Sequence, residues 1–136
     1  MKKIKILVPL DTTEKSTHSL NWIKKYFDKN DIEITLMNVR EIIVAEDLLI
    51  PAYLGDMEEE SNLVLDEASM ELEGYTVDKF ATFGYASDQI LKKAEKDNYD
   101  MIIMTKSTKK GLIRVIGSVT SKVIKNAKAS VIVLPK

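Results

Sequence analysis

Short runs of apolar residues alternate along the chain with longer segments in which apolar residues recur every three or four positions. The short runs are rich in β-branched and large aliphatic residues, which is typical of buried strands. The longer segments predict amphipathic helices, because a period of 3.6 residues places the apolar side chains on one helix face. We expect strands at 3–10, 32–39, 76–83, 101–104 and 130–134, and helices at 14–27, 56–73, 88–97 and 118–126.

The alternation of strands and helices indicates an α/β fold. Strands joined through helices pair in parallel, since each right-handed crossover returns the chain to the same edge of the sheet. We therefore expect an open five-stranded parallel sheet with helices on both faces, formed by one domain, 1–136. Ligands of such sheets bind at the carboxyl ends of the strands. The residues expected there are Asp11, Val39, Gly84 and the loop 105–108.

Three local details are predicted separately. Ser87 is expected to cap the third helix. Residues 58–60, all glutamate, are expected in the first turns of the second helix, where carboxylates favour the positive end of the helix dipole. Residues 40–55 are largely apolar but lack a clean period and contain Pro51. We expect them to form a long excursion, with or without a short helix, that packs over the sheet edge of its own domain in preference to a partner.

The segment 105–117 joins the fourth strand to the last helix and has the composition of an anion-binding loop. Backbone N–H groups at the start of a helix attract anions, and neighbouring cations strengthen that attraction. A phosphate group is the simplest anion for such a site. The basic residues and glycines of the segment are Lys106, Lys109, Lys110, Gly111, Arg114 and Gly117.

Charge is distributed in blocks, although the formal net charge is only -1. Residues 41–75 carry 11 acidic and no basic side chains, whereas residues 101–136 carry eight basic and no acidic side chains. A local field of this kind steers charged ligands where the total charge cannot. The sequence leaves an alternative open, in which the basic last helix simply faces the acidic second helix or solvent.

Composition excludes several kinds of site. The chain has no cysteine and one histidine, His18, so thiolate sites, histidine metal centres and Ser-His-Asp triads are excluded within one chain. We expect His18 to be a surface or half-buried helix residue. The glycine turn of a dinucleotide site, the Gly-Lys-Ser/Thr of a Walker loop and the acidic residues of a receiver domain are also missing.

No run of residues approaches the ~20 apolar positions that span a bilayer, and the start of the chain does not have the pattern of a secretory leader. We therefore expect a cytoplasmic protein with no membrane partner and no nucleic-acid partner.

The chain resembles the universal stress protein domain from end to end. The segments that carry the resemblance are KIKILVPLDTTEKSTHSLNWI, MNV, FATFGYASDQILKKAEKDNYDMIIMTKS and GSVTSKVIKNAKASVIVLPK. The resemblance implies a Rossmann-like sheet of the adenine nucleotide alpha hydrolase-like type, with strand order 3-2-1-4-5, and a homodimer. In one branch of the family it also implies ATP or AMP at the strand ends.

That branch is marked by Gly-x-x-Gly, nine residues, and then Gly-Ser or Gly-Thr. Here Thr105 and Thr108 stand at the two loop glycines, and eight residues separate Thr108 from Gly117. Glycine lets backbone N–H groups approach a phosphate, so the threonines are expected to weaken triphosphate binding. The resemblance places Asp11 near the ribose, Val39 beside the adenine, and Gly117, Ser118 and Thr120 near the phosphates, while Lys109 and Lys110 could replace lost contacts with charge.

Asp11 has a second interpretation as the N-cap of the first helix, and both roles can hold at once. For the whole chain we expect a regulatory or binding module, a non-catalytic homodimer whose adenine-nucleotide binding is weak, altered or absent, with no metal of its own. The alternatives are an ATP- or AMP-binding stress protein that hydrolyses ATP slowly, and a structural interaction protein that uses residues 40–55. The β-branched strand 130–134 is expected at a sheet edge, paired with its copy in a second chain.

Overall fold

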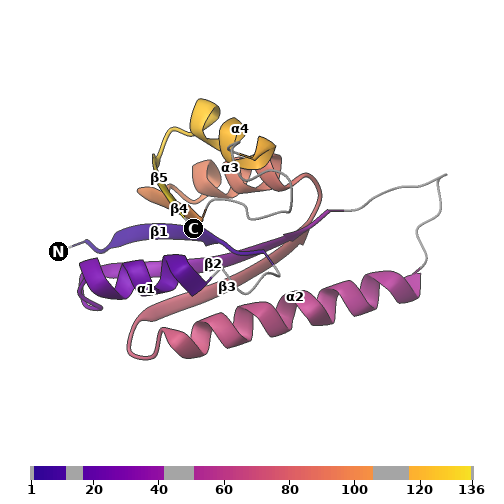
Figure 1. Ribbon diagram of the computed structural model, residues 1–136, viewed down its shortest axis with the longest axis horizontal. Helices are drawn as coiled ribbons and strands as arrows, with labels where there is room; N and C mark the ends of the chain where they lie inside the picture. Colours follow the sequence, from indigo (N-terminus) through magenta and orange to yellow (C-terminus); the bar gives the residue numbers. More distant parts are fainter. Residues whose placement is uncertain (1, 12–16, 42–50, 106–116, 136) are drawn as a thin grey trace.

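The computed structural model describes residues 2–11, 17–41, 51–105 and 117–135, and within these ranges strands alternate with helices as predicted (Figure 1). The strands are β1 (Ile4–Pro9), β2 (Ile32–Arg40), β3 (Thr76–Phe83), β4 (Met101–Thr105) and β5 (Ser130–Leu134). The helices are α1 (Thr17–Tyr26), α2 (Pro51–Glu71), α3 (Ala86–Lys96) and α4 (Ser118–Asn126). His18 is exposed on α1, as expected.

The five strands form one parallel sheet in the order β3-β2-β1-β4-β5. Helices α1 and α2 lie against one face, and α3 and α4 against the other (Figure 1). The predicted fold class and strand order are therefore confirmed. Because all strands run in the same direction, their carboxyl ends meet along one edge of the sheet, which we call the carboxyl edge.

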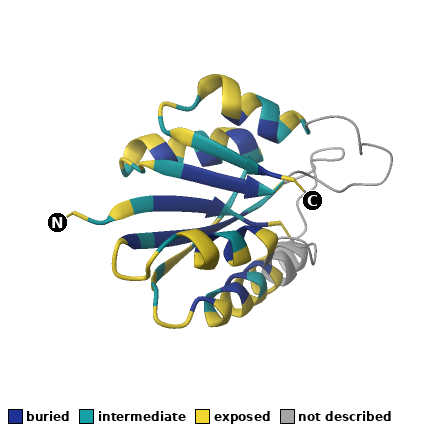
Figure 2. Cartoon of the chain, turned by 60° about the vertical axis from the view of Figure 1, so that its left-hand side comes forward, coloured by how far each residue is buried: buried dark blue, intermediate teal, exposed yellow. Residues whose placement is uncertain are grey.

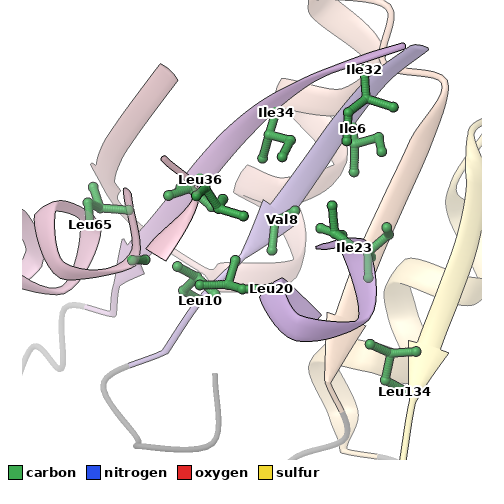
Figure 3. Packing of buried hydrophobic residues seen from close by; sticks show 13 residues of the cluster. Ile6, Val8, Leu10, Leu20, Ile23, Ile32, Ile34, Leu36, Leu65 and Leu134 are labelled. Carbon is green, nitrogen blue, oxygen red and sulfur yellow. The ribbon is translucent and has the colours of Figure 1, made fainter. Parts of the chain in front are cut away.

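The core consists of two layers, one on each face of the sheet. Successive side chains of a strand point to opposite sides, so Ile6 and Val8 of β1 pack toward α1 and α2 (Figure 3), whereas Leu7 packs toward α3 and α4. The central strands are the most deeply buried part of the molecule (Figure 2). Burial of each large aliphatic side chain contributes roughly 1.5–3 kcal/mol, which holds the helices on the sheet.

Helix α2 differs from the prediction at its start. It begins at Pro51 rather than near residue 56, because proline is tolerated in the first turn of a helix, where its missing N–H has no intrahelical partner. The expected irregular excursion is therefore wrong for 51–55, while 42–50 lies outside the described residues. Glu58, Glu59 and Glu60 lie beyond the first turn, so the dipole explanation for them is also wrong.

Helix α3 also begins earlier than predicted, at Ala86, with Tyr85 as its N-cap residue and no capping side chain. Ser87 is buried inside the first turn, so its predicted capping role is wrong. The turn is made by Gly84, whose φ of +136 favours glycine. A Cβ there would lie 2.9 Å from the Gln89 side-chain nitrogen, so Gly84 lets α3 start directly after β3.

Candidate functional site

The carboxyl edge has a switch in winding direction between β1 and β4. From β1 the chain continues to β2 and β3 on one side, and then returns to β4 and β5 on the other. The connections after β1 and β4 therefore lead to helices on opposite faces, α1 and α4 (Figure 1). An opening between two such connections is the usual ligand site of an open α/β sheet.

Strand pairing brings the predicted residues of this region into register. β1 pairs with β2 up to Pro9 and Met37, and with β4 at Leu7 and Ile102. Continued by count, the same register sets Asp11 opposite Val39, and Leu10 opposite Thr105. Asp11 is exposed, while Val39 is half-buried against the α3 and α4 side of the core.

Thr105 ends β4 at this switch point, and its hydroxyl is a buried polar group whose hydrogen bonding is incomplete. The Oγ1 atom is buried and has no hydrogen-bond partner among the residues that the structure describes. A buried hydroxyl without a partner costs roughly 1–3 kcal/mol, so such groups in native proteins call for an explanation. At this position, a bound ligand atom would provide one.

Helix α4 starts close in sequence to the same strand end. Its N-cap residue is Gly117, which offers no capping side chain, and Ser118 at the first helical position is exposed. The first N–H groups of a helix have no intrahelical acceptor, and the helix dipole makes this end positive. Thr120 is buried one turn into the helix and therefore supports α4 rather than facing solvent.

The predicted site residues thus divide into two groups. Asp11, Val39, Thr105 and the start of α4 belong to the carboxyl edge, on strands or turns that the topology makes neighbours. Thr108, Lys109 and Lys110 lie outside the described residues.

A buried polar chain at the same edge was missed by sequence reasoning. Asn38 on β2 is 2% exposed, and its amide nitrogen donates to the Leu10 carbonyl at 2.7 Å. The Ser61 hydroxyl of α2 donates to the Asn38 carbonyl oxygen, and Arg40 Nε donates to the Ser61 oxygen at 3.2 Å. The available signal was a lone amide within the apolar run of β2, because a buried polar group requires partners.

Arg40 completes this chain through its guanidinium. Its Nη2 atom lies 3.3 Å from a Glu60 carboxylate oxygen, close enough for an ion pair, although the geometry there does not make a hydrogen bond. The Arg40 side chain is only 14% exposed, so this pair is screened less than an open surface pair. The backbone carbonyl of Arg40 also accepts from the Gly84 amide at 3.0 Å, which joins β2 to the turn before α3.

Two basic side chains, Lys122 of α4 and Lys128 just after it, pair with acidic side chains of α3. Lys122 lies 2.7 Å from Asp88, and Lys128 lies 2.8 Å from Glu95, whose hydrogen bond raises the pKa of Lys128. Since α2 and α4 cover opposite faces of the sheet, the basic last helix does not face the acidic second helix, and that half of the alternative is wrong. Lys122 and Lys125 of α4 are exposed, which agrees with its other half, a helix that faces solvent. Exposed pairs of this kind stabilise a protein weakly.

A hollow of about 500 Å³ lies away from the carboxyl edge, toward the amino-terminal half of β2 and β3. Several of its polar groups already have partners, because Lys93 pairs with Asp97, and the Tyr99 hydroxyl lies 2.6 Å from the Thr35 hydroxyl. Lys93 also lies over the Phe80 ring. We therefore do not take this hollow as the functional site.

The described part of the chain contains neither a metal-binding cluster nor a membrane-spanning helix. Among residues 2–11, 17–41, 51–105 and 117–135, there is no group of three or more His, Cys, Asp or Glu side chains arranged to hold a metal ion. Within the same ranges, no helix is both long and apolar enough to cross a membrane.

Comparison with known sequences gives one family. Residues 4–135 match the universal stress protein family. Universal stress protein MJ0531 from Methanocaldococcus jannaschii is 31% identical over 146 residues, covering 97% of this chain and 82% of that protein.

Comparison with solved structures gives the same fold. Hypothetical protein MJ0577 is 26% identical with a TM-score of 0.75, covering 100% of this chain and 98% of that one. A universal stress protein family protein from Arabidopsis thaliana, solved with AMP bound, is 18% identical with a TM-score of 0.72, covering 98% of this chain and 92% of that one.

Proposed function

The chain belongs to the universal stress protein family, and we propose that it is a non-catalytic regulatory module that binds an adenine nucleotide weakly at the carboxyl edge. The observation that carries the proposal is the buried Thr105 hydroxyl at the switch point of the sheet, which has no hydrogen-bond partner within residues 2–11, 17–41, 51–105 and 117–135. A phosphate or ribose oxygen would satisfy this hydroxyl. The structure of the Arabidopsis thaliana universal stress protein family protein with AMP bound supports the choice of an adenine nucleotide.

The start of α4 supports an anionic group in this ligand. Gly117 provides no side-chain cap, the first N–H groups of a helix have no intrahelical acceptor, and the positive end of the helix dipole adds to their attraction for an anion. Asp11 is exposed two residues after β1, and we expect its carboxylate to accept from a ribose hydroxyl rather than to approach a phosphate.

Binding is weak because of the two threonines in the positions of loop glycines. Glycine lets backbone N–H groups approach a phosphate, so a residue with a Cβ atom at each of these positions is expected to remove charge-assisted hydrogen bonds. Two such bonds at roughly 1.5–3 kcal/mol each correspond to a loss of about two to four orders of magnitude in affinity. We therefore expect dissociation constants well above the submicromolar range.

The module is proposed to be non-catalytic because phosphoryl transfer needs a positioned water and concentrated positive charge in a closed site. Among the described residues, no group of three or more His, Cys, Asp or Glu side chains is arranged to hold a metal ion such as the magnesium of a phosphoryl-transfer site.

We also propose a homodimer formed through β5. This strand lies at one edge of the sheet, and Val131, Ile132 and Val133 are only partly buried there. An apolar edge strand with free N–H and C=O groups promotes aggregation unless it is covered. Antiparallel pairing of β5 with its copy would cover both edges around a two-fold axis.

Calorimetric titration with ATP, AMP and inorganic phosphate tests the binding proposal. We expect adenine nucleotides to bind in the micromolar to millimolar range. Submicromolar ATP binding would show that the two threonines do no harm. Absence of heat with all three probes, together with unchanged spectra on their addition, would overturn the proposal.

A further inference from the structure

The polar chain formed by Asn38, Ser61 and Arg40 has only one possible direction. An arginine guanidinium can only donate, so the Ser61 oxygen accepts from Arg40 Nε. The single hydroxyl hydrogen of Ser61 is then directed to the Asn38 carbonyl oxygen. The Asn38 amide hydrogens must therefore point to the Leu10 carbonyl.

The Leu10 carbonyl is the last main-chain acceptor before Asp11. Backbone pairing of β1 with β2 ends at Pro9 and Met37, followed by the bond from the Leu10 amide to the Met37 carbonyl at 2.7 Å. Beyond this point, the Asn38 side chain holds β1 to β2. The Leu10 carbonyl carbon is bonded to the Asp11 nitrogen, so the amide of Asn38 sets the peptide plane from which Asp11 projects.

We propose that Asn38 is a positioning residue for ligand binding, which fixes the end of β1 so that Asp11 meets the nucleotide, with Ser61 and Arg40 fixing the orientation of its amide. This inference rests on the proposed function for its ligand and goes beyond it in naming how the site is held. It also gives α2 a role at the site, because Ser61 and Glu60 belong to that helix.

The substitution Asn38→Asp tests the direction of the chain, because it changes one atom type at constant shape. An ionised carboxylate can only accept, so it would face the Leu10 carbonyl with a second acceptor. A protonated carboxyl group can donate to Leu10 and accept from Ser61, as the amide does. The described charged groups around this position are Arg40 on β2, Glu60 on α2, which pair with each other, and Asp11 beyond Leu10.

The variant should therefore bind in a pH-dependent way that the wild type does not share. Because position 38 is buried against the Leu10 carbonyl, we expect the pKa of the introduced carboxyl to lie well above its ordinary value of about 4. At pH 7.5 we expect Asn38→Asp to bind AMP about tenfold more weakly than the wild type, and near pH 5 the two should agree within about twofold. Comparison at each pH removes the effect of AMP's own titration. Asn62→Asp is the matched control, because Asn62 is exposed on α2 and its substitution introduces the same negative charge. It should bind like the wild type at both pH values.

A second readout does not need a ligand. The carbonyl carbon shift of Leu10 and the amide shift of Asp11, measured by NMR on labelled protein, report the hydrogen bond and the position it fixes. Both should move in Asn38→Asp at pH 7.5 and return near pH 5. Moved shifts with unchanged AMP affinity would overturn the positioning role and leave the proposed function intact. If the wild type binds no adenine compound, the proposed function fails, and unmoved shifts would independently show that Asn38 does not hold the strand end.

Discussion

Replacement of Thr105 by valine should separate stability from binding. The Thr105 Oγ1 atom is buried without a hydrogen-bond partner in the described part of the chain, and a buried hydroxyl of this kind costs folding free energy. Valine has nearly the same shape and no polar atom to leave unsatisfied. With a cost of roughly 1–3 kcal/mol for such a group, Thr105→Val should raise the free energy of unfolding by about 1 kcal/mol, and the melting temperature by a few degrees.

The same change should weaken ligand binding, because the hydroxyl loses the one situation in which it has a partner. A neutral hydrogen bond contributes about 1 kcal/mol net, so the dissociation constant for AMP should rise about fivefold. Calorimetry measures both quantities on the same samples. Thr76→Val is the control, since the Thr76 hydroxyl is exposed at the opposite edge and accepts from Lys3 at 3.0 Å. That variant should bind AMP like the wild type.

The reasoning would be refuted by the opposite pair of results. If Thr105→Val lowers stability by about 1 kcal/mol or more and leaves AMP affinity unchanged, the hydroxyl is satisfied within the free protein and has no part in a site.

Three further predictions concern the dimer, catalysis and pH. The Ser130 amide donates to the Asp100 carbonyl of the neighbouring segment, and because amides alternate along a strand, the Val133 amide points away from β4. Val133→Pro should therefore sediment as a monomer, whereas Val133→Thr should remain a dimer. A dimeric proline variant would contradict pairing through β5. ATP turnover should stay far below ~1–100 s⁻¹, and enzymatic turnover abolished by Asp11→Ala would show that the module is an enzyme. The hydrogen bond from Lys93 lowers the pKa of Asp97 below its ordinary 3.8, so the stabilisation by this pair is present above pH 3.8 and is lost as the pH falls through the folded-state pKa. Calorimetric melting should show Asp97→Asn less stable than the wild type at pH 7, with a difference in stability that narrows below about pH 4. A difference that stays constant with pH would contradict this.

The sequence predicted the strands well, because each is a short apolar run bounded by turn residues. The bounds expected for β3 and β5 agree with the structure, and β2 differs by one residue. Strand order could not be obtained from periodicity, since periodicity reports which face is buried and not which strand lies beside which. The order came from the family resemblance and is confirmed by the strand pairing.

The helix starts were less predictable for a physical reason. Ser87 has the side chain of a good N-cap, yet the chain turns earlier because Gly84 adopts a φ of +136, and α3 starts before the serine is reached. Pro51 was taken as a breaker, but at the first position of a helix it is favourable. In both cases, local preference alone did not decide between two allowed positions.

The candidate site was predictable where it depends on topology. Asp11, Val39 and Thr105 follow from the rule that ligands bind at the carboxyl edge, and the strand register makes them neighbours. Asn38 was not found, because its partners Leu10 and Ser61 lie 28 and 23 residues away in sequence. The sequence also could not predict that the Thr105 hydroxyl lacks a hydrogen-bond partner among the described residues, since this depends on every element packed around it.

Nucleotide binding at the carboxyl edge is tested most directly by an NMR titration of the labelled protein with AMP, followed through the backbone amides. We expect saturable changes in amide chemical shift that are confined to Asp11, Val39, Thr105, Gly117 and Ser118, with a dissociation constant between micromolar and millimolar. Saturable shifts confined to the other end of the sheet, around Tyr99 and Asp100, or no shifts at millimolar AMP, would contradict it.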